Sequence, residues 1–268
     1  MDFKEHEKKY WDEFYDQNNS SYHESNDLIY HHDFKKYIKK LDKGSKVLQL
    51  ACGVRYDGVE FAKDGLIMYE TDISETAVLK TEEVYQKLGI EKNGEFFACD
   101  AEHLPFDDNF FDASFIIASF HHLPDPQKAL IEMKRVTKKD GFIILGLEPN
   151  SWPYFTIFWL LKPLKIIVRK INKKFFHSIA DDTTHGFSRR ELLSFVKEAD
   201  LELVDIKRAK YLSELYDSSI RLLSKIIKKP IKLNNNMQNI LAKLDDFISG
   251  ISFINFFNWH WSVIAKKK

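Results

Sequence analysis

Residues 95–147 read EFFACDAEHLPFDDNFFDASFIIASFHHLPDPQKALIEMKRVTKKDGFIILGL. This stretch holds three short apolar runs, EFFAC, ASFIIA and FIILGL. Between the last two runs lies a helical pattern, which Asp125 and Pro126 open and which reaches Val136 before Gly141. Short buried runs that alternate with helical patterns predict a parallel sheet with helices on both faces.

The same alternation extends toward the N-terminus. The runs KVLQL (46–50) and LIMY (66–69) predict two further strands. A helix is expected from Ser74 through Lys87, because Ser74 is a favourable N-cap and Gly89 a favourable end.

Composition and charge narrow the functional classes. A chain of 268 residues with 44% hydrophobic and 30% charged residues suits one soluble α/β core with an elaboration. Forty basic and 40 acidic residues give a formal charge of zero, so no global attraction to nucleic acid is expected. Cys52 and Cys99 form neither a CxxC pair nor a metal-ligand spacing, and the first residues, MDFKEHEKK, lack an apolar signal region. We therefore expect a cytoplasmic protein without a metal site.

The residues that follow the predicted strands suggest a ligand, because open parallel sheets bind ligands beyond the carboxyl ends of their strands. The first strand runs into small residues up to Gly53, where backbone N–H groups can approach a polar ligand. Asp72 ends the second strand 19 residues later, close to the spacing at which a carboxylate binds ribose hydroxyls. Asp100 follows the third strand, where an acid can meet an exocyclic amine. Each feature alone fits a tight turn or a helix cap, but together they predict a nucleoside site.

The chain resembles the class I S-adenosylmethionine-dependent methyltransferases, especially the group with small-molecule and quinone-methylating enzymes. The resemblance is carried by VLQLACG (47–53), MYETDIS (68–74) and the continuous run from FFACD to FIIL (96–145). The stretches THGFSRRELLSFVKEADLELVDIK and WHWSVIAKK resemble that family's last two strands. It implies a Rossmann-like, seven-stranded, mostly parallel sheet of order 3-2-1-4-5-7-6, with an antiparallel last strand, helices on both faces and a helical cap.

The resemblance also implies S-adenosyl-L-methionine as cofactor and assigns residues to it. The implied contacts are Gln49, Ala51, Cys52 and Gly53 for the methionine part, Asp72 and Ile73 for the ribose and adenine, Asp100 and Ala101 for the adenine, and Ile117 and Ala118 for the sulfonium. His121, on the substrate side of the loop after the fourth strand, is the first candidate for a base if the acceptor is a hydroxyl or phenol. We expect His122 to be structural.

Three positions depart from the family's first motif. Ala51 and Arg55 stand where glycines are usual, and Gln49 stands where an acid is usual. Alanine is tolerable at a close approach if its φ stays negative, whereas Arg55 adds bulk and charge beside a bound cation unless it turns to solvent. We expect binding to survive, with the cofactor's carboxylate drawn toward Arg55 or neighbouring amides.

We divide the chain on these patterns. Residues 1–45 form an N-terminal helical lid of two helices, and 46–150 form the cofactor-binding half. Two helical cap insertions span 151–180 and 211–255, and the remainder of the sheet comes from 181–210 and 256–268. His185, where the cap returns to the sheet, is a candidate second substrate contact or part of a helix start, and His31 and His32 are surface or lid residues.

The first insertion bears on the acceptor. Residues 151–180 contain six basic residues and no acidic one, and Leu161, Leu164, Val168 and Ile171 recur at helical spacing. We favour a cap helix packed on the sheet; the alternative is a peripheral contact of residues 152–174 with an anionic membrane. Both place an aromatic roof over the substrate side: Trp152, Tyr154, Phe155, Phe158 and Trp159. We therefore expect a small, hydrophobic or lipid-linked acceptor and no nucleic acid.

Two alternatives remain open. One is a binding protein on the same fold that has lost turnover, for which Gln49, Ala51 and Arg55 are the support. The other is a dinucleotide-dependent oxidoreductase, which is weaker because a GxGxxG motif is absent.

Overall fold

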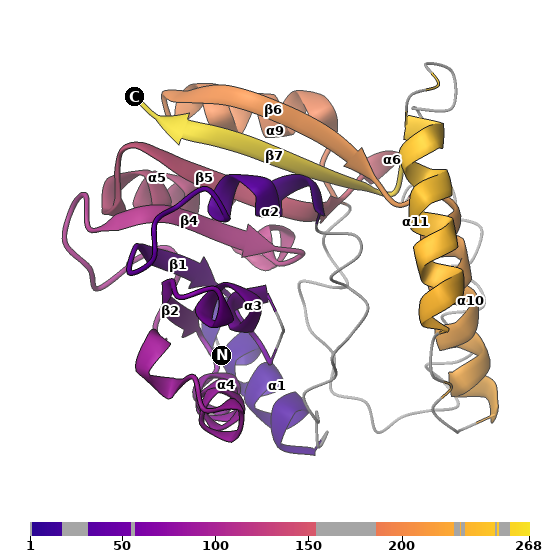
Figure 1. Ribbon diagram of the computed structural model, residues 1–268, viewed down its shortest axis with the longest axis horizontal. Helices are drawn as coiled ribbons and strands as arrows, with labels where there is room; N and C mark the ends of the chain where they lie inside the picture. Colours follow the sequence, from indigo (N-terminus) through magenta and orange to yellow (C-terminus); the bar gives the residue numbers. More distant parts are fainter. Residues whose placement is uncertain are drawn as a thin grey trace.

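A seven-stranded sheet organises the part of the chain that the structure, a computed structural model, describes: residues 2–17, 32–54, 57–153, 186–227, 231, 234–249, 251 and 258–268. Its strands are β1 (Lys46–Leu50), β2 (Ile67–Asp72), β3 (Gly94–Ala98), β4 (Phe111–Ile117), β5 (Thr137–Pro149), β6 (Leu201–Ala209) and β7 (His260–Lys267). They lie in the order β3-β2-β1-β4-β5-β7-β6, and β7 runs antiparallel to both of its neighbours (Figure 1). The predicted fold class, strand order and antiparallel last strand are confirmed.

The helices cover both faces of this sheet. The helices of the described residues are α1 (Phe3–Gln17), α2 (His32–Ile38), α3 (Asp57–Lys63), α4 (Glu75–Leu88), α5 (Pro126–Val136), α6 (Ser151–Pro153), α9 (Arg189–Glu198), α10 (Leu212–Ile227) and α11 (Asn235–Ser249), with short 3-10 turns η2 (Glu91–Asn93) and η3 (Phe120–His122). The Ser74 hydroxyl accepts the N–H of Ala77 at the start of α4, and Gly89 ends that helix with a φ of 67°. Asp125 caps α5. The helix starts and the glycine stop are as the sequence predicts.

The side chains of alternate strand residues pack into two separate hydrophobic clusters, one on each face of the sheet. In β1, Val47 packs with residues of α2, α3 and α4, whereas Leu48 and Leu50 pack with residues of α5 and α9. In β4, Phe115 and Ile117 join the first cluster and Ile116 joins the second. This period of two follows from the pleat of a strand that is buried on both faces. It determines which side chains can point toward a ligand at the edge of the sheet.

The second insertion forms a helical hairpin. Helices α10 and α11 pack side by side beyond the end of β6 (Figure 1). Asp245 of α11 joins them, because its carboxylate accepts the N–H groups of Tyr211, Leu212 and Ser213 at the start of α10. Both helices lie within the predicted insertion 211–255, whose role as a cap stays a prediction.

Most of the first insertion lies outside the described residues. Only α6, with Trp152, belongs to the described chain, so the predicted stripe from Leu161 to Ile171 and the rest of the aromatic roof are not among the described residues. Arg55, His31 and His185 are also outside them. Within the described ranges, none of the helices has the length and apolarity needed to cross a bilayer.

Candidate functional site

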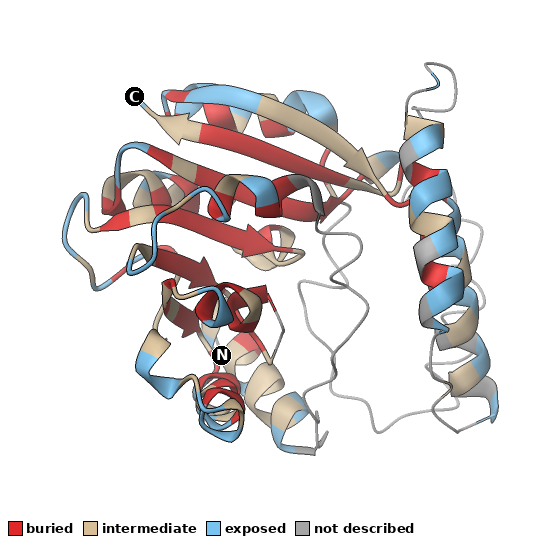
Figure 2. Ribbon diagram, in the orientation of Figure 1, coloured by how far each residue is buried: buried red, intermediate tan, exposed pale blue. Residues whose placement is uncertain are grey.

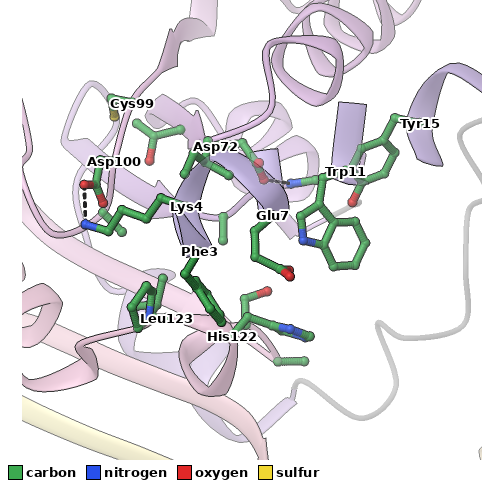
Figure 3. A pocket seen from close by; sticks show the side chains of 18 of the residues that line it. Phe3, Lys4, Glu7, Trp11, Tyr15, Asp72, Cys99, Asp100, His122 and Leu123 are labelled. Atoms are coloured by element: carbon green, nitrogen blue, oxygen red, sulfur yellow. Dashed lines mark hydrogen bonds and ion pairs between the residues drawn. The ribbon is translucent and has the colours of Figure 1, made fainter. Parts of the chain in front are cut away.

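A cavity of about 310 Å³ lies beyond the carboxyl ends of β1 to β4, in the size range of small-molecule sites. Seven of the predicted contacts line it: Ala51, Gly53, Asp72, Ile73, Asp100, Ala101 and Ala118. Helix α1 supplies another part of the wall, through Phe3, Lys4, Glu7, Trp11 and Tyr15 (Figure 3). The structure therefore gathers residues from four strand ends and the N-terminal helix around one space.

Asp72 is the buried acid of this cavity. Its Oδ2 accepts the N–H of Gly53 and its Oδ1 accepts the N–H of Ser74, both at 2.9 Å. Burial raises the pKa of Asp72 to about 6, although these hydrogen bonds from Ser74 and Gly53 oppose the rise. At neutral pH the group is a carboxylate whose oxygens retain lone pairs for further donors. It is suited to accept hydrogen bonds from vicinal hydroxyls.

The turn after β1 is built without the usual first glycine. Ala51 has a φ of 48° and Gly53 a φ of 53°, so the condition under which alanine would be tolerable here, a negative φ, is not met. A left-handed alanine costs about 1 kcal/mol or somewhat more. Hydrogen bonds offset that cost: the N–H of Cys52 donates to the carbonyl of Thr71 at 2.9 Å, and the Thr81 hydroxyl donates to the carbonyl of Gly53 at 2.5 Å.

Three predicted contacts have side chains that do not line the cavity. Gln49 lies on the same face of β1 as Val47, beneath α3, and Ile117 belongs to the core cluster on that face. Cys52 is also buried, and burial raises the pKa of its thiol well above the usual range. The pleat of the strands turns Gln49 and Ile117 away from the edge. The assignment of these three residues to the cofactor stays a prediction.

Asp100 is already paired in this structure. Lys4 of α1 places its Nζ 2.6 Å from Asp100 Oδ2 and 2.7 Å from Glu102 Oε2 (Figure 3). Burial opposes ionisation of Asp100, but the hydrogen bonds from Lys4 and from the N–H of Glu102 outweigh it and lower its pKa. The ion pairs fasten the start of α1 to the loop after β3, so α1 closes one side of the cavity.

The two adjacent histidines are placed differently from the expectation. His122, predicted as structural, lines the cavity and meets Trp11 edge to face, with 5.7 Å between the ring centres. Burial, together with repulsion from His121, lowers the pKa of His122 to about 3, so its ring is neutral at physiological pH. His121 is not among the lining residues, and its Nδ1 lies 2.8 Å from Glu148 Oε2. The assignment of His121 as base stays a prediction.

Glu148, at the end of β5, was not predicted as a functional residue. Its fully buried carboxylate accepts the N–H groups of Ser119, Phe120 and His121 at 3.0–3.1 Å, as well as contacting the His121 ring. One side chain thus holds the whole loop between β4 and α5 at the edge of the cavity. The signal in the sequence was an acid at the end of the otherwise apolar run FIILGLEP.

Helix α1 was predicted as a helix, but its lining residues were not identified. Lys4, Glu7, Trp11 and Tyr15 recur at spacings of three and four and so share one helical face. Asp12 anchors the same helix to the start of α4, because it accepts the Ser74 hydroxyl at 2.6 Å and the N–H of Thr76 at 3.1 Å. In the sequence, this face was marked by charged and aromatic residues that recur at helical spacing.

A buried acid lies beneath the turn after β1. Glu70 of β2 is 1% exposed, and its Oε1 accepts the Tyr85 hydroxyl at 2.6 Å. Burial raises the pKa of Glu70 to about 8, so it is largely protonated at neutral pH. Any side chain at Gly58 would collide with this carboxyl group, because an added Cβ would lie 1.7 Å from Glu70 Oε1.

This acid makes a testable contribution to stability. The pKa of Glu70 is about 8 in the folded protein, whereas its ordinary value is 4.5. Between pH 4.5 and pH 8, the folded state therefore binds a proton that the unfolded state has released. Stability from this group is complete below pH 4.5 and is lost as the pH rises toward 8. The free energy of unfolding, measured by urea denaturation, should fall between pH 5 and pH 8.5 in the wild-type chain. In Glu70→Gln the fall over the same range should be smaller than in wild type by roughly 2 to 4 kcal/mol. The exposed Glu95→Gln on the neighbouring strand is the control, and equal pH profiles for Glu70→Gln and wild type would contradict the assignment.

Comparisons with known proteins agree with this geometry. A family model described as a methyltransferase domain matches residues 48–145. The chain is 32% identical over 140 residues to a demethylmenaquinone methyltransferase of Paenarthrobacter aurescens, covering 48% of this chain and 50% of that protein. It is 31% identical over 170 residues to a demethylmenaquinone methyltransferase of Corynebacterium glutamicum, covering 59% of this chain and 69% of that protein. The first of these matches therefore spans about half of the relative's length.

A likeness to solved structures supports the fold. The geranyl diphosphate C-methyltransferase of Streptomyces coelicolor, in complex with Mg²⁺, geranyl diphosphate and S-adenosyl-L-homocysteine, superposes with a TM-score of 0.59 at 12% identity. The match covers 100% of this chain and 98% of that one.

Proposed function

The chain belongs to the class I S-adenosylmethionine-dependent methyltransferase family, and we propose that it transfers the methyl group of this cofactor to a small hydrophobic acceptor. The proposal rests mainly on the Asp72 carboxylate, which lines the cavity. Hydrogen bonds from the N–H groups of Gly53 and Ser74 fix its orientation. The comparisons support neither the inactive binding protein nor the oxidoreductase considered from the sequence.

The residues around the cavity suit the cofactor. Asp72 would accept the two ribose hydroxyls, since its oxygens keep lone pairs beside the two backbone N–H groups. Ile73, Ala101 and Leu123 offer apolar surface for an adenine ring. Ala51 and Gly53 of the turn after β1 line the same space and would meet the amino-acid end.

The protein's part in the reaction is mainly placement. The bound cofactor supplies a methyl group already activated on a sulfonium, so the chemistry needs an in-line nucleophile at about 3–3.5 Å. Phe3, Trp11 and Tyr15 line the cavity and would shield the bound cofactor from water. His121 would take the acceptor's proton, and the Glu148 carboxylate, 2.8 Å from His121 Nδ1, would stabilise the imidazolium that forms.

We propose a quinone-type, lipid-linked molecule as the acceptor. The two relatives above are named demethylmenaquinone methyltransferases, and the cavity wall supplies aromatic and apolar surface from Phe3, Trp11 and Leu123. The lipid tail of such an acceptor would hold it in a membrane.

The test is transfer of a labelled methyl group from the cofactor to demethylmenaquinone that has been chemically reduced to its quinol, in detergent micelles, because the electron-rich quinol ring, unlike the quinone, can act as the nucleophile. We expect labelled product with the wild-type chain and a loss of at least about 100-fold in kcat for His121→Ala, with cofactor affinity retained. Full turnover in His121→Ala would remove the base assignment. Absence of transfer to any quinone, with transfer to another molecule of a lipid extract, would reject the acceptor class and leave methyl transfer standing.

A further inference from the structure

The α10–α11 hairpin has an unusual distribution of side chains. Polar residues are buried where its helices meet: Asp217 accepts a hydrogen bond from Gln238 at 3.1 Å, and Asp245 bonds to Ser213. Apolar residues of both helices are exposed instead. Helices of a globular protein normally bury their apolar face, so this arrangement leaves a face of the hairpin to be covered by something else.

The exposed apolar residues of α11 form one continuous stripe. Met237, Ile240, Leu244 and Phe247 follow one another at spacings of three, four and three, which places them on a single helical face. Their exposed fractions are 43%, 54%, 42% and 73%. On α10, Leu215, Leu223 and Ile227 are exposed as well, at 45–49%. Figure 2 shows how much of the hairpin is exposed in comparison with the strands.

Basic residues accompany this stripe in the sequence. From residue 218 to residue 244 there is no acidic residue, and the basic ones are Arg221, Lys225, Lys228, Lys229, Lys232 and Lys243. With residues 151–180, these two segments contain twelve of the 40 basic residues and none of the 40 acidic ones. The rest of the chain therefore has a formal charge of −12. Over its full span, 211–255, the second insertion also contains Glu214, Asp217, Asp245 and Asp246, so its net charge is +2, against +6 for residues 151–180.

The hairpin is attached at the edge of the sheet that holds the cavity. β6 is parallel to β5, because both are antiparallel to β7. Its last residue, Ala209, therefore lies at the carboxyl-end edge, and α10 begins at Leu212. Figure 1 shows the hairpin beyond the ends of the strands at that edge. A surface that contacts the hairpin would lie on the same side of the protein as the opening of the site.

We propose that the exposed face of the α10–α11 hairpin docks on an anionic lipid bilayer. An apolar helical stripe with basic residues near it in the sequence is the chemistry of a helix that lies in a membrane interface. A second copy of this chain would bring two net-positive segments together, and a nucleic acid would leave the apolar stripe in water. Docking would hold the cavity edge near a lipid-linked acceptor; this last step rests on the proposed function, whereas docking itself does not.

Flotation with lipid vesicles tests the inference on the full chain without cofactor. We expect the protein to bind vesicles of equal parts phosphatidylcholine and phosphatidylglycerol at least about tenfold more tightly than vesicles of phosphatidylcholine alone. Raising the salt to about 0.5 M should weaken the binding, because it screens the lysines. Equal binding to both kinds of vesicle would overturn the part of the inference that rests on charge.

Two matched variants distinguish vesicle binding by the α11 stripe from nonspecific binding by any exposed apolar side chain. Ile240→Ser with Phe247→Ser should reduce binding to the anionic vesicles at least about tenfold, because both side chains leave the interface. The control, Leu79→Ser with Ile131→Ser, removes two side chains of similar exposure, 60% and 48%, from α4 and α5 and should bind like wild type. Thermal melting checks that both variants fold.

Other outcomes would overturn the inference. Unchanged vesicle binding in the stripe variant would show that another surface makes the contact. A wild-type dimer in sedimentation velocity that the stripe variant dissociates, together with no vesicle binding, would assign the face to a second copy. Vesicle binding is measured without methyl transfer, so failure here is distinguishable from failure of the proposed function.

Discussion

Asp72→Asn is expected to weaken binding of S-adenosylhomocysteine by at least about 100-fold. In the wild-type chain each carboxylate oxygen already accepts one backbone N–H, from Gly53 or Ser74, and offers its remaining lone pairs to the cavity. The amide of asparagine has a single acceptor oxygen and presents an NH₂ group to one of these donors. Loss of two charge-assisted hydrogen bonds, each worth about 1.5 kcal/mol or more, accounts for the expected factor.

Isothermal titration calorimetry gives the affinities, with the exposed Asp107→Asn as the matched control. The wild-type affinity should also fall as the pH drops through about 6, because protonation of Asp72 removes its acceptor capacity. Asp72→Asn should lack this pH dependence. A variant that folds and binds the ligand within a factor of two of wild type would show that Asp72 does not hold the ribose.

Glu148→Ala is expected to lower the free energy of unfolding by about 3 to 5 kcal/mol, or to prevent folding. The carboxylate is fully buried and accepts three backbone N–H groups of the loop between β4 and α5. Removing it leaves those donors without an acceptor in the interior. The η3 turn would then lose its attachment to β5.

Urea denaturation measures this change, and Glu202→Ala, which removes an exposed acid from β6, is the control. Glu148→Gln keeps one acceptor oxygen and should cost less than Glu148→Ala, which provides a folded variant if the alanine variant does not express. Equal unfolding free energies for Glu148→Ala and the control would contradict the role assigned to this side chain.

The fold was predictable because local signals agree with the global pattern. The strands are short apolar runs, and Ser74, Gly89 and Asp125 mark helix ends by their own backbone chemistry. Boundaries were less certain: β5 begins at Thr137, before the predicted break at Gly141, because Thr137 pairs with Phe111. Pairing with a neighbour, which a single segment does not encode, determined where that strand starts.

The cavity was predictable where the chain itself marks it. Asp72, Asp100 and Gly53 follow strands whose carboxyl ends must meet at one edge. The contribution of α1 was not predictable, because the contact of Lys4 with Asp100 joins residues 96 positions apart. Similarly, the position of His121 depends on Glu148, 27 positions away in the sequence, whose carboxylate lies 2.8 Å from His121 Nδ1.

The central claim is that the cavity at the ends of β1, β2 and β3 holds the adenosyl part of the methyl donor. A crystal structure of the chain grown with S-adenosylhomocysteine tests it most directly. We expect the two ribose hydroxyls within about 3 Å of the Asp72 carboxylate oxygens, with the adenine beside Ile73 and Ala101. Ligand bound elsewhere, or a cavity filled by the Arg55 guanidinium with no ligand in it, would contradict the claim.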